Sequence, residues 1–345
     1  MADNAVQIKY LTDSTHQDWD TYIESKVDST FFHLSAWRTV LEKGLKHKAH
    51  YLYAEKNGKI VGVLPLAQIR SILFGHSLVS TPFCVYGGAV TDDESVSKAL
   101  IAKATNLANN LKVDYLEVRN KTPVQKDWLI KNLYVTFRKE IDVDSEANML
   151  AIPRKQRAMV RKGIKAGLVS EIEDNIDNFY RAYSESVRNL GTPVFPKQYF
   201  KVLFEVFQDK CDILTVKKRS DLVSSVLSFY FRDEVLPYYG GGTSISRMVK
   251  GNDFMYWELM RRSGENGIRI FDYGRSKEGT GSYSFKKNWG FQPTPLSYEY
   301  YLVKATELPD VNPLNPKYQS FIKIWRKLPL SVANTVGPYI AKNLG

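Results

Sequence analysis

The stretch GIRIFDYGRSKEGTGSYSFKKNWGFQP, residues 267–293, has the pattern of a strand, a glycine-rich turn and a helix. The apolar run 268–273 predicts a strand that breaks at Gly274, and a helix is expected around residues 283–289. Glycine is typical where a backbone turns tightly or approaches a ligand. Charged side chains at such a break point into a cleft; those in this stretch are Asp272, Arg275, Lys286 and Lys287. A solvated loop with two surface lysines is the alternative interpretation.

The elements before this stretch follow an order that the first half of the chain also shows. The second half predicts helices at 178–188 and 197–208, strands at 213–217, 222–231 and 235–239, and a helix at 252–265. The first half predicts a hairpin at Asn57-Gly58, an apolar run near Leu78, a helix at 92–111 and a strand at 114–119. Tyr86-Gly87-Gly88 corresponds to Tyr239-Gly240-Gly241, and YLEVRN corresponds to IFDYGR. Two copies of one α/β unit explain this repeat.

Length and composition agree with a two-domain globular protein. The chain has 345 residues, of which 43% are hydrophobic, more than a single core usually accommodates. We expect an α/β (α+β) protein with a first domain at 1–165, a second at 166–305 and a basic helical tail at 306–345. Only the second copy ends in the glycine- and lysine-rich motif. We therefore expect it to carry most of the chemistry, while the first copy mainly shapes the cleft.

The net charge of +11 predicts an anionic partner, and nucleic acid, a phosphorylated carrier and an anionic membrane surface all qualify. Cys84 and Cys211 are isolated, so neither a zinc site nor a disulfide framework is indicated, and no metal is expected. The polar, acidic N-terminal segment and the lack of a sufficiently apolar stretch predict a cytoplasmic protein.

Two further segments carry concentrated positive charge. IPRKQRAMVRKGIKAGL, residues 152–168, predicts a basic helix that holds a substrate phosphate, with Arg154, Arg157 and Arg161 as candidates; a solvated charged face is the alternative. The tail LNPKYQSFIKIWRKLPLSVANTVGPYIAKNLG, residues 314–345, predicts a basic amphipathic segment. It either packs on the protein itself or makes peripheral contact with the inner face of the cytoplasmic membrane.

FDYGRS at 271–276, Gly281 and FKKNWGF at 285–291 closely resemble the C-terminal signature of the FemAB-type acyltransferases, whose fold is a doubled GNAT domain. The resemblance extends from about residue 31 to residue 301. Within the family, the chain is most similar to the FemAB-related proteins associated with bacterial exosortase (PEP-CTERM) and exopolysaccharide systems.

The resemblance implies roles for individual residues. Lys286 after Phe285 matches the family's Phe-Lys pair, in which the lysine stabilises the oxyanion or the leaving group. Asp272 orients Arg275, accepts a proton through water or caps the following turn, and Arg275 clamps a phosphate or carboxylate. Arg188 and Tyr183 lie in a stretch that resembles the family's substrate-binding segment; contact with carbonyls at the helix end is the alternative for Arg188. Tyr239, Gly240 and Gly241 are substrate-binding candidates from their place at the end of a strand, where packing is the alternative for Tyr239. Arg247, Lys250, Gly251 and Asn252 occupy the position where GNAT enzymes bind the coenzyme A pyrophosphate, with a degenerate glycine pattern.

Three functions fit these observations. The first is an acyl or aminoacyl transferase that forms an amide on an amine of a cell-envelope polysaccharide or its lipid-linked precursor. The second is a GNAT-type acyl-coenzyme A N-acyltransferase that acts on a small-molecule or protein amine. The third is a non-catalytic binding protein of the same fold. No tightly bound cofactor is expected, and the acyl donor is either aminoacyl-tRNA or acyl-coenzyme A.

Overall fold

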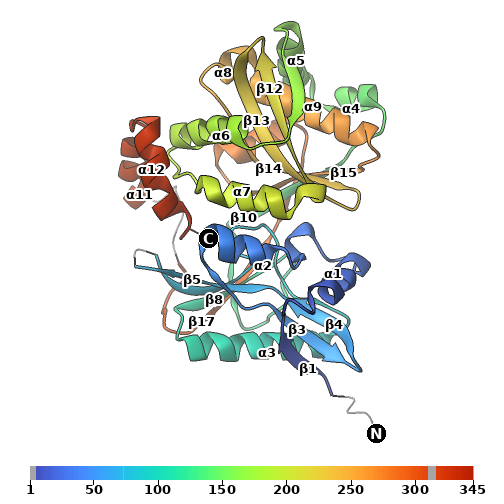
Figure 1. Ribbon diagram of the computed structural model, residues 1–345, viewed down its shortest axis with the longest axis vertical. Coiled ribbons are helices and arrows are strands. Elements are labelled where there is room, and N and C mark those ends of the chain that lie inside the picture. The colour runs from blue at the N-terminus through green and yellow to red at the C-terminus, as the bar shows by residue number, and fades with distance from the viewer. Residues whose placement is uncertain (1–4, 73, 310–315, 345) are drawn as a thin grey trace. The chain divides into compact units, whose positions relative to one another are not determined.

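The computed structural model describes residues 5–72, 74–309 and 316–344 and comprises two compact units (Figure 1). Unit 1 contains residues 1–133, 295–310 and 342–345; unit 2 contains residues 134–294 and 311–341. The expected mixed α/β class is confirmed. Residues 310–315 and 345 of the expected tail lie outside the described residues.

Unit 1 is built on two sheets and one long helix. The smaller sheet has the order β1 (Gln7–Tyr10), β3 (Leu52–Lys56), β4 (Lys59–Leu64), β7 (Val90–Thr91). The larger has the order β2 (Lys48–Ala49), β5 (Leu66–Ser71), β6 (Gly75–Ser80), β8 (Tyr115–Asn120), β17 (Ser297–Leu302), β9 (Leu129–Lys131). The helical elements are α1 (His16–Ser25), a 3-10 turn (Phe31–His33), α2 (Trp37–Thr39), a π-helical segment (Val40–Leu45) and α3 (Glu94–Leu111). Asn57 and Gly58 both have positive φ between β3 and β4, which confirms the hairpin.

Unit 2 is built on one sheet of seven strands. Its order is β11 (Val169–Glu173), β12 (Cys211–Lys218), β13 (Asp221–Phe231), β14 (Glu234–Gly242), β15 (Ile270–Lys277), β10 (Tyr134–Glu140), β16 (Pro293–Pro295). The helices are α4 (Ser145–Ala151), α5 (Arg154–Lys165), α6 (Asp177–Leu190), α7 (Lys197–Val206), a 3-10 turn (Gln208–Lys210), α8 (Ser246–Val249), α9 (Gly251–Glu265), α10 (Gly281–Asn288), α11 (Pro316–Trp325) and α12 (Leu330–Ala341). β14 and β15 are parallel and pair only at their first residues, Glu234 with Ile270 and Val235 with Phe271.

The unit boundaries differ from the expected domain ranges because two strands are exchanged. β10 precedes the second copy in the sequence, yet it pairs with β15 in the sheet of unit 2. β17 follows the second copy and pairs with β8 in unit 1. The basic helix α5, expected at the end of the first domain, lies in unit 2.

Helices cover both faces of the unit 2 sheet. A side chain at Gly241 would collide with Ser186 and Ala182 of α6, whereas one at Gly242 would collide with Ser246 and Asn252 at the starts of α8 and α9. Because successive strand residues point to opposite faces, α6 and α9 lie on opposite faces of β14. The apolar core between α9 and the sheet includes Met255, Phe271 and Trp289.

The described part of the tail packs on unit 2, which is one of the two alternatives that the sequence left open. α11 and α12 both contact α6. A side chain at Gly191 would collide with Ile322, and one at Gly337 would contact the backbone of Val194. Within the described part of the chain, no helix has the length and hydrophobicity needed to span a bilayer.

Candidate active site at the β15 bulge

β15 does not end at Gly274 as the sequence predicts; it continues to Lys277. Thr136 pairs with Arg275 and Arg138 pairs with Asp272, so one residue of β10 faces two residues of β15. Gly274 has φ of 64°, so the extra residue forms a β-bulge with a glycine in the left-handed region. The same glycine signal fits a turn or a bulge, and the partner strand β10 decides between them. The bulge redirects the carbonyl groups of residues 274 and 275.

Lys286 occupies the space beside this bulge. Its Nζ donates hydrogen bonds of 3.0 Å to the carbonyl oxygens of both Gly274 and Arg275. The ammonium nitrogen also lies 5.5 Å from the centre of the Phe137 ring. The residue is only 9% exposed, so backbone oxygens and an aromatic ring replace most of the water that a surface lysine contacts.

Burial lowers the pKa of Lys286 from 10.5 to about 7; the nearby charge of Asp272 opposes this shift and that of Arg275 adds to it. A large fraction of the side chain is therefore neutral near pH 7. A neutral amine has two N–H donors, which match the two carbonyl acceptors, and one lone pair that accepts a proton. The position suits a residue that accepts a proton during a reaction.

Asp272 supports the bulge. Its Oδ1 accepts a 2.7 Å hydrogen bond from the Gly274 backbone N–H, and its Oδ2 lies 3.4 Å from Nε of Arg138. This is the turn-capping role among the expected alternatives, and the Asp272 side chain is fully buried. The guanidinium of Arg275 lies over the Tyr134 ring at 4.8 Å, so β10 contacts both Asp272 and Arg275.

A second cluster surrounds a hollow of about 540 Å³ at the start of α9, here called the α9 pocket. It brings together Arg247, Lys250 and Asn252 from the expected donor site with Phe285 from the expected catalytic pair. The remaining lining residues are Ser186, Asn189, Leu190, Gly242, Thr243, Ser244, Ser246 and Asp253. Phe285 directly precedes Lys286 on α10, so this helix joins the α9 pocket to the bulge.

The sequence interpretation missed Asp253, which lines the α9 pocket. Burial raises its pKa to about 6, and Gln156 of α5 donates a hydrogen bond to its Oδ1. Asp253 directly follows the Gly251-Asn252 pair, so its place in the first turn of a helix was the available signal. A carboxylate beside Arg247 and Lys250 gives the pocket groups of both charges.

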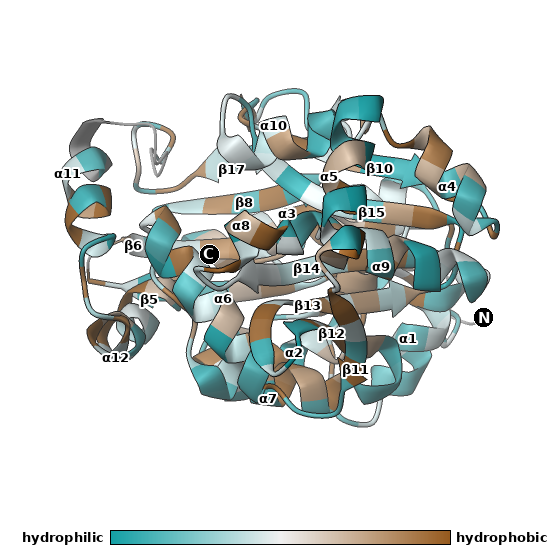
Figure 2. Ribbon diagram, turned by 90° about the horizontal axis from the view of Figure 1, so that it is seen from above, coloured by the Kyte–Doolittle hydropathy of each residue, from teal (hydrophilic) through white to brown (hydrophobic). Residues whose placement is uncertain are grey.

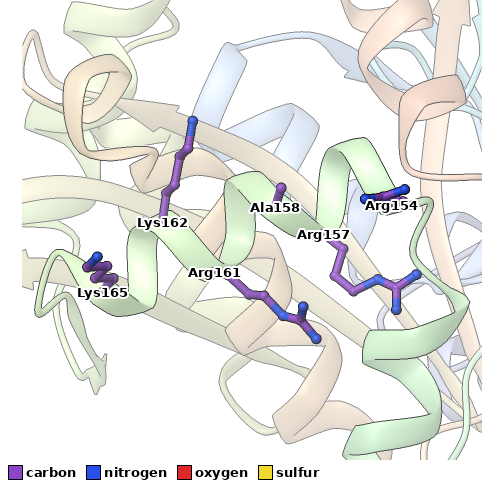
Figure 3. A pocket seen from close by; sticks show the side chains of 6 residues that line it. All are labelled: Arg154, Arg157, Ala158, Arg161, Lys162 and Lys165. Carbon is purple, nitrogen blue, oxygen red and sulfur yellow. The ribbon is translucent and has the colours of Figure 1, made fainter.

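The cations of α5 form an exposed face with no acidic neighbour in the helix. A hollow of about 450 Å³ is lined by Arg154, Arg157, Ala158, Arg161, Lys162 and Lys165. Figure 3 shows the side chains of Arg157 and Arg161 on the same side of α5, with Lys162 on the other. Among the described residues, the α5 cations that line this hollow make neither an ion pair nor a side-chain hydrogen bond. Like charges one turn apart repel, and a bound anion relieves that repulsion.

Tyr239 and Tyr183 lie in an aromatic cluster rather than at the bulge or in the α9 pocket. Their rings are 5.7 Å apart, and both pack edge-to-face on Phe200. The hydroxyl of Tyr239 is 2.9 Å from the hydroxyl of Tyr199. Both tyrosines therefore take part in packing between β14, α6 and α7, and their expected substrate-binding role stays a prediction.

Three of the candidate glycines serve close packing. A side chain at Gly240 would meet Val226 and the Tyr256 hydroxyl at 3.3 Å, and one at Gly241 would lie 2.6 Å from Ser186. At Gly251 it would lie 2.2 Å from Val223, so this glycine lets α9 begin against β13. These three glycines shape the walls around the α9 pocket without lining it. The glycine that does line it is Gly242, which the sequence pattern did not indicate.

Arg188 holds the tail. Its Nη1 donates a 3.1 Å hydrogen bond to the carbonyl oxygen of Leu328, in the turn between α11 and α12. In the structure this arginine thus contacts a carbonyl 140 residues further along the chain, and its expected substrate-binding role stays a prediction.

Unit 1 has a different arrangement at the corresponding place. Arg119 occupies the position equivalent to Gly274, is only 2% exposed, and pairs with Glu117 through a 2.7 Å contact. Its Nη1 donates a second hydrogen bond to the carbonyl oxygen of Cys84. β8 and β17 pair in continuous register, without a bulge. At the sequence position that corresponds to Gly274, unit 1 therefore has a buried arginine in an ion pair and no bulge.

Cys84 and Cys211 are both buried, and they do not form a disulfide. Among the described residues there is no group of three or more histidine, cysteine, aspartate or glutamate side chains arranged to hold a metal ion.

Comparison with known proteins supports the GNAT-like fold. Residues 153–287 match the family model described as "Acetyltransferase (GNAT) domain". No curated protein matches the chain. The structure resembles that of FemX with a TM-score of 0.66 and 15% identity, covering 92% of this chain and 100% of that one.

Two further solved structures share the fold. The C-terminal domain of a putative lysylphosphatidylglycerol synthetase from Agrobacterium fabrum has a TM-score of 0.56 at 13% identity, covering 82% of this chain and 91% of that one. A tandem GNAT protein from the clavulanic acid biosynthesis pathway has a TM-score of 0.55 at 11% identity, covering 88% and 100%. At these identities the comparisons show a tandem GNAT-like fold.

Proposed function

We propose that this protein is an N-acyltransferase that transfers an acyl or aminoacyl group to an amine of a cell-envelope polysaccharide or its lipid-linked precursor. The observation that carries the proposal is the placement of Lys286, whose buried amine rests on two bulge carbonyls one residue after Phe285 of the α9 pocket. The resemblance to FemAB-type proteins supports an acceptor in the envelope. The similarity to exosortase-associated members favours a polysaccharide acceptor and a place on the cytoplasmic side of the membrane.

The reaction joins an amine to an activated carbonyl. The acceptor amine attacks the carbonyl carbon of the donor, a C–N bond forms, and the C–O bond of an aminoacyl ester or the C–S bond of a thioester breaks. Neutral Lys286 takes the proton that the attacking nitrogen loses and later returns it to the leaving group. The two carbonyl oxygens stabilise the transient ammonium through charge-assisted hydrogen bonds.

Arg247 and Lys250 hold the phosphate groups of the donor in this proposal. Both carriers have phosphates, joined to the activated carbonyl through the terminal ribose in aminoacyl-tRNA and through the longer pantetheine arm in acyl-coenzyme A, so phosphates of either carrier are candidates for this pocket. The cations of α5 extend the favourable potential for a large anion.

Transfer from acyl-coenzyme A to a small-molecule or protein amine is the second candidate. The description of the matched family as an acetyltransferase favours it. The name of the Agrobacterium neighbour refers instead to a lysylated lipid. A non-catalytic binding protein is the third candidate, and the Lys286 environment argues against it because a binding site has no need of a lysine that titrates near neutral pH.

Native mass spectrometry of the full chain with acetyl-coenzyme A and with aminoacylated tRNA tests the donor. Arg247→Ala is expected to weaken binding of the true donor about tenfold or more, the loss typical of a hydrogen bond to a charged group. Arg269→Ala is the matched control, since Arg269 is exposed and lies outside the α9 pocket. Failure of both donors to bind, or equal effects of the two variants, contradicts the assignment of the pocket.

Turnover is tested with Lys286→Met, which keeps the length and apolar stem of the side chain. Loss of transfer with unchanged donor binding supports the role of Lys286 as a base. Unchanged transfer contradicts it.

A further inference from the structure

The tail presents an exposed face that packing on unit 2 does not use. On α11, Ile322 and Trp325 point toward the protein, and Trp325 is only 3% exposed. Phe321 and Ile324 are 39% and 65% exposed. On α12, Ala333 and Gly337 are buried, while Val332, Val336 and Tyr339 form an exposed stripe one and two turns apart. Both helices are thus apolar on two sides.

Cations accompany these apolar residues. Lys323, Arg326 and Lys327 are exposed on or directly after α11. At 3.6 residues per turn, Lys323 and Lys327 both lie beside Ile324, on the side of it away from Phe321 and Trp325. Figure 2 shows hydrophobic and hydrophilic residues in turn along α11. This combination of exposed apolar side chains with lysines beside them is typical of helices that lie in a membrane interface.

Charge distribution selects the partner. The whole chain contains 37 acidic residues, yet none occurs from position 311 to the end, where lysine and arginine are the only charged side chains. A protein partner of unspecified charge gives no reason for such a complete absence of acids. An anionic lipid surface gives one, because each lysine or arginine near the surface adds to binding and each acid subtracts from it.

The tail is attached beside the α9 pocket. Arg326 donates a hydrogen bond of 3.3 Å to the carbonyl oxygen of Leu190, a residue that lines the pocket and is 63% exposed. Met248, 76% exposed, follows the pocket residue Arg247. Exposed apolar side chains therefore occur at the pocket rim as well as on the tail that is fixed to it.

We propose that the outer face of α11 and α12, made by Phe321, Ile324, Val332, Val336 and Tyr339 with Lys323 and Lys327, docks on an anionic lipid bilayer. The apolar side chains enter the headgroup region, and the lysines extend to the lipid phosphates. This proposal rests on exposure and charge and is independent of the reaction assigned to the α9 pocket.

Cosedimentation of the full chain with lipid vesicles tests the proposal. We expect binding to vesicles of phosphatidylcholine mixed with phosphatidylglycerol, weaker binding to phosphatidylcholine alone, and a decrease with rising salt. Lys323→Ser with Lys327→Ser is expected to reduce partitioning about fivefold for each lysine removed. Ile324→Ser is expected to reduce it as well, since it removes a 65% exposed apolar side chain.

Val27→Ser and Ile72→Ser in unit 1 are the matched controls, because these side chains are 89% and 104% exposed and lie outside the tail. Thermal unfolding of each variant verifies that the tail remains packed. Equal binding of wild type, tail variants and controls overturns the proposal, as does equal binding to neutral and anionic vesicles. A dimer that the Ile324→Ser variant dissociates, without vesicle binding by wild type, also overturns it and assigns the face to a second copy of the chain.

Discussion

The Nζ atom of Lys286 lies 3.0 Å from the carbonyl oxygen of Gly274, the glycine whose positive φ creates the bulge in β15. A single backbone irregularity thus supplies acceptors for a buried amine, and α10 brings that amine to them. Bulges next to active sites commonly redirect groups in this way. Substitution of Lys286 and substitution of Gly274 are therefore expected to affect the transfer reaction in different ways.

The pH dependence of kcat/KM separates the two roles open to Lys286. Burial lowers its pKa to about 7, so the amine is protonated below that value and neutral above it. If it accepts a proton, transfer increases as pH rises through about 7; if it stabilises an oxyanion as a cation, transfer decreases over the same range. We expect the increase. An arginine at position 286 stays protonated over the whole pH range, so Lys286→Arg is expected to abolish the increase of kcat/KM with pH. A kcat/KM that falls with pH in the wild type contradicts the proton-acceptor role.

Gly274→Ala is expected to reduce turnover beyond its effect on stability. An alanine at φ of 64° costs about 1–2 kcal/mol, and relief of that strain moves the carbonyl that Lys286 contacts. Gly279→Ala is the matched control: Gly279 has φ of 77°, and an added side chain would meet no atom within 4 Å. Urea unfolding and steady-state kinetics of both variants distinguish strain from the loss of this contact. Equal kinetic effects contradict a specific role for the bulge.

Part of the site could be predicted from local sequence. FDYGRS and FKKNWG place Asp272, Arg275 and Lys286 within 15 residues, and the structure brings all three to the end region of β15. Arg247, Lys250 and Asn252 likewise lie together because the short helix α8, the residue after it and the first turn of α9 carry them. Residues that are close in sequence within one supersecondary unit are usually also close in space.

The remaining features depend on partners distant in the chain. Gly274 is compatible with a turn or a bulge until β10 pairs with it, and nothing local in residues 134–140 indicates that they join the sheet of the second copy. Arg188 has the position of a helix-terminal residue, but its hydrogen-bond acceptor belongs to the tail. A tyrosine such as Tyr183 or Tyr239 is compatible with a polar cleft and with an aromatic core. Contact with Phe200 of α7 places both residues in an aromatic core, and the local sequence does not predict that contact.

Arg188→Ala is expected to loosen α11 and α12 without lowering activity directly. The variant leaves the Leu328 carbonyl without this donor, a loss of about 0.5–1.5 kcal/mol for a part-buried hydrogen bond. Hydrogen exchange should report faster exchange in residues 316–341 and little change near β15. A higher KM with unchanged hydrogen exchange in the tail contradicts the structural role and instead supports substrate binding by Arg188.

Arg119→Met provides the corresponding test for unit 1. Removing the guanidinium takes away the charge partner of Glu117, whose carboxylate stays buried with the Tyr300 hydroxyl 2.9 Å from its Oε2. Breaking a buried pair in this way is expected to cost about 3–5 kcal/mol, measured by urea unfolding.

Replacing both partners, Arg119→Met with Glu117→Leu, is expected to recover much of that loss, because no uncompensated charge remains. The proposed reaction is assigned to residues of unit 2, and Arg119 and Glu117 belong to unit 1. The folded fraction of either variant should therefore keep the wild-type kcat. Equal instability of the single and double variants would show that packing, rather than charge, dominates at this position. A change in kcat per folded molecule would instead give unit 1 a part in the chemistry, contrary to the asymmetry that the bulge and the buried ion pair define.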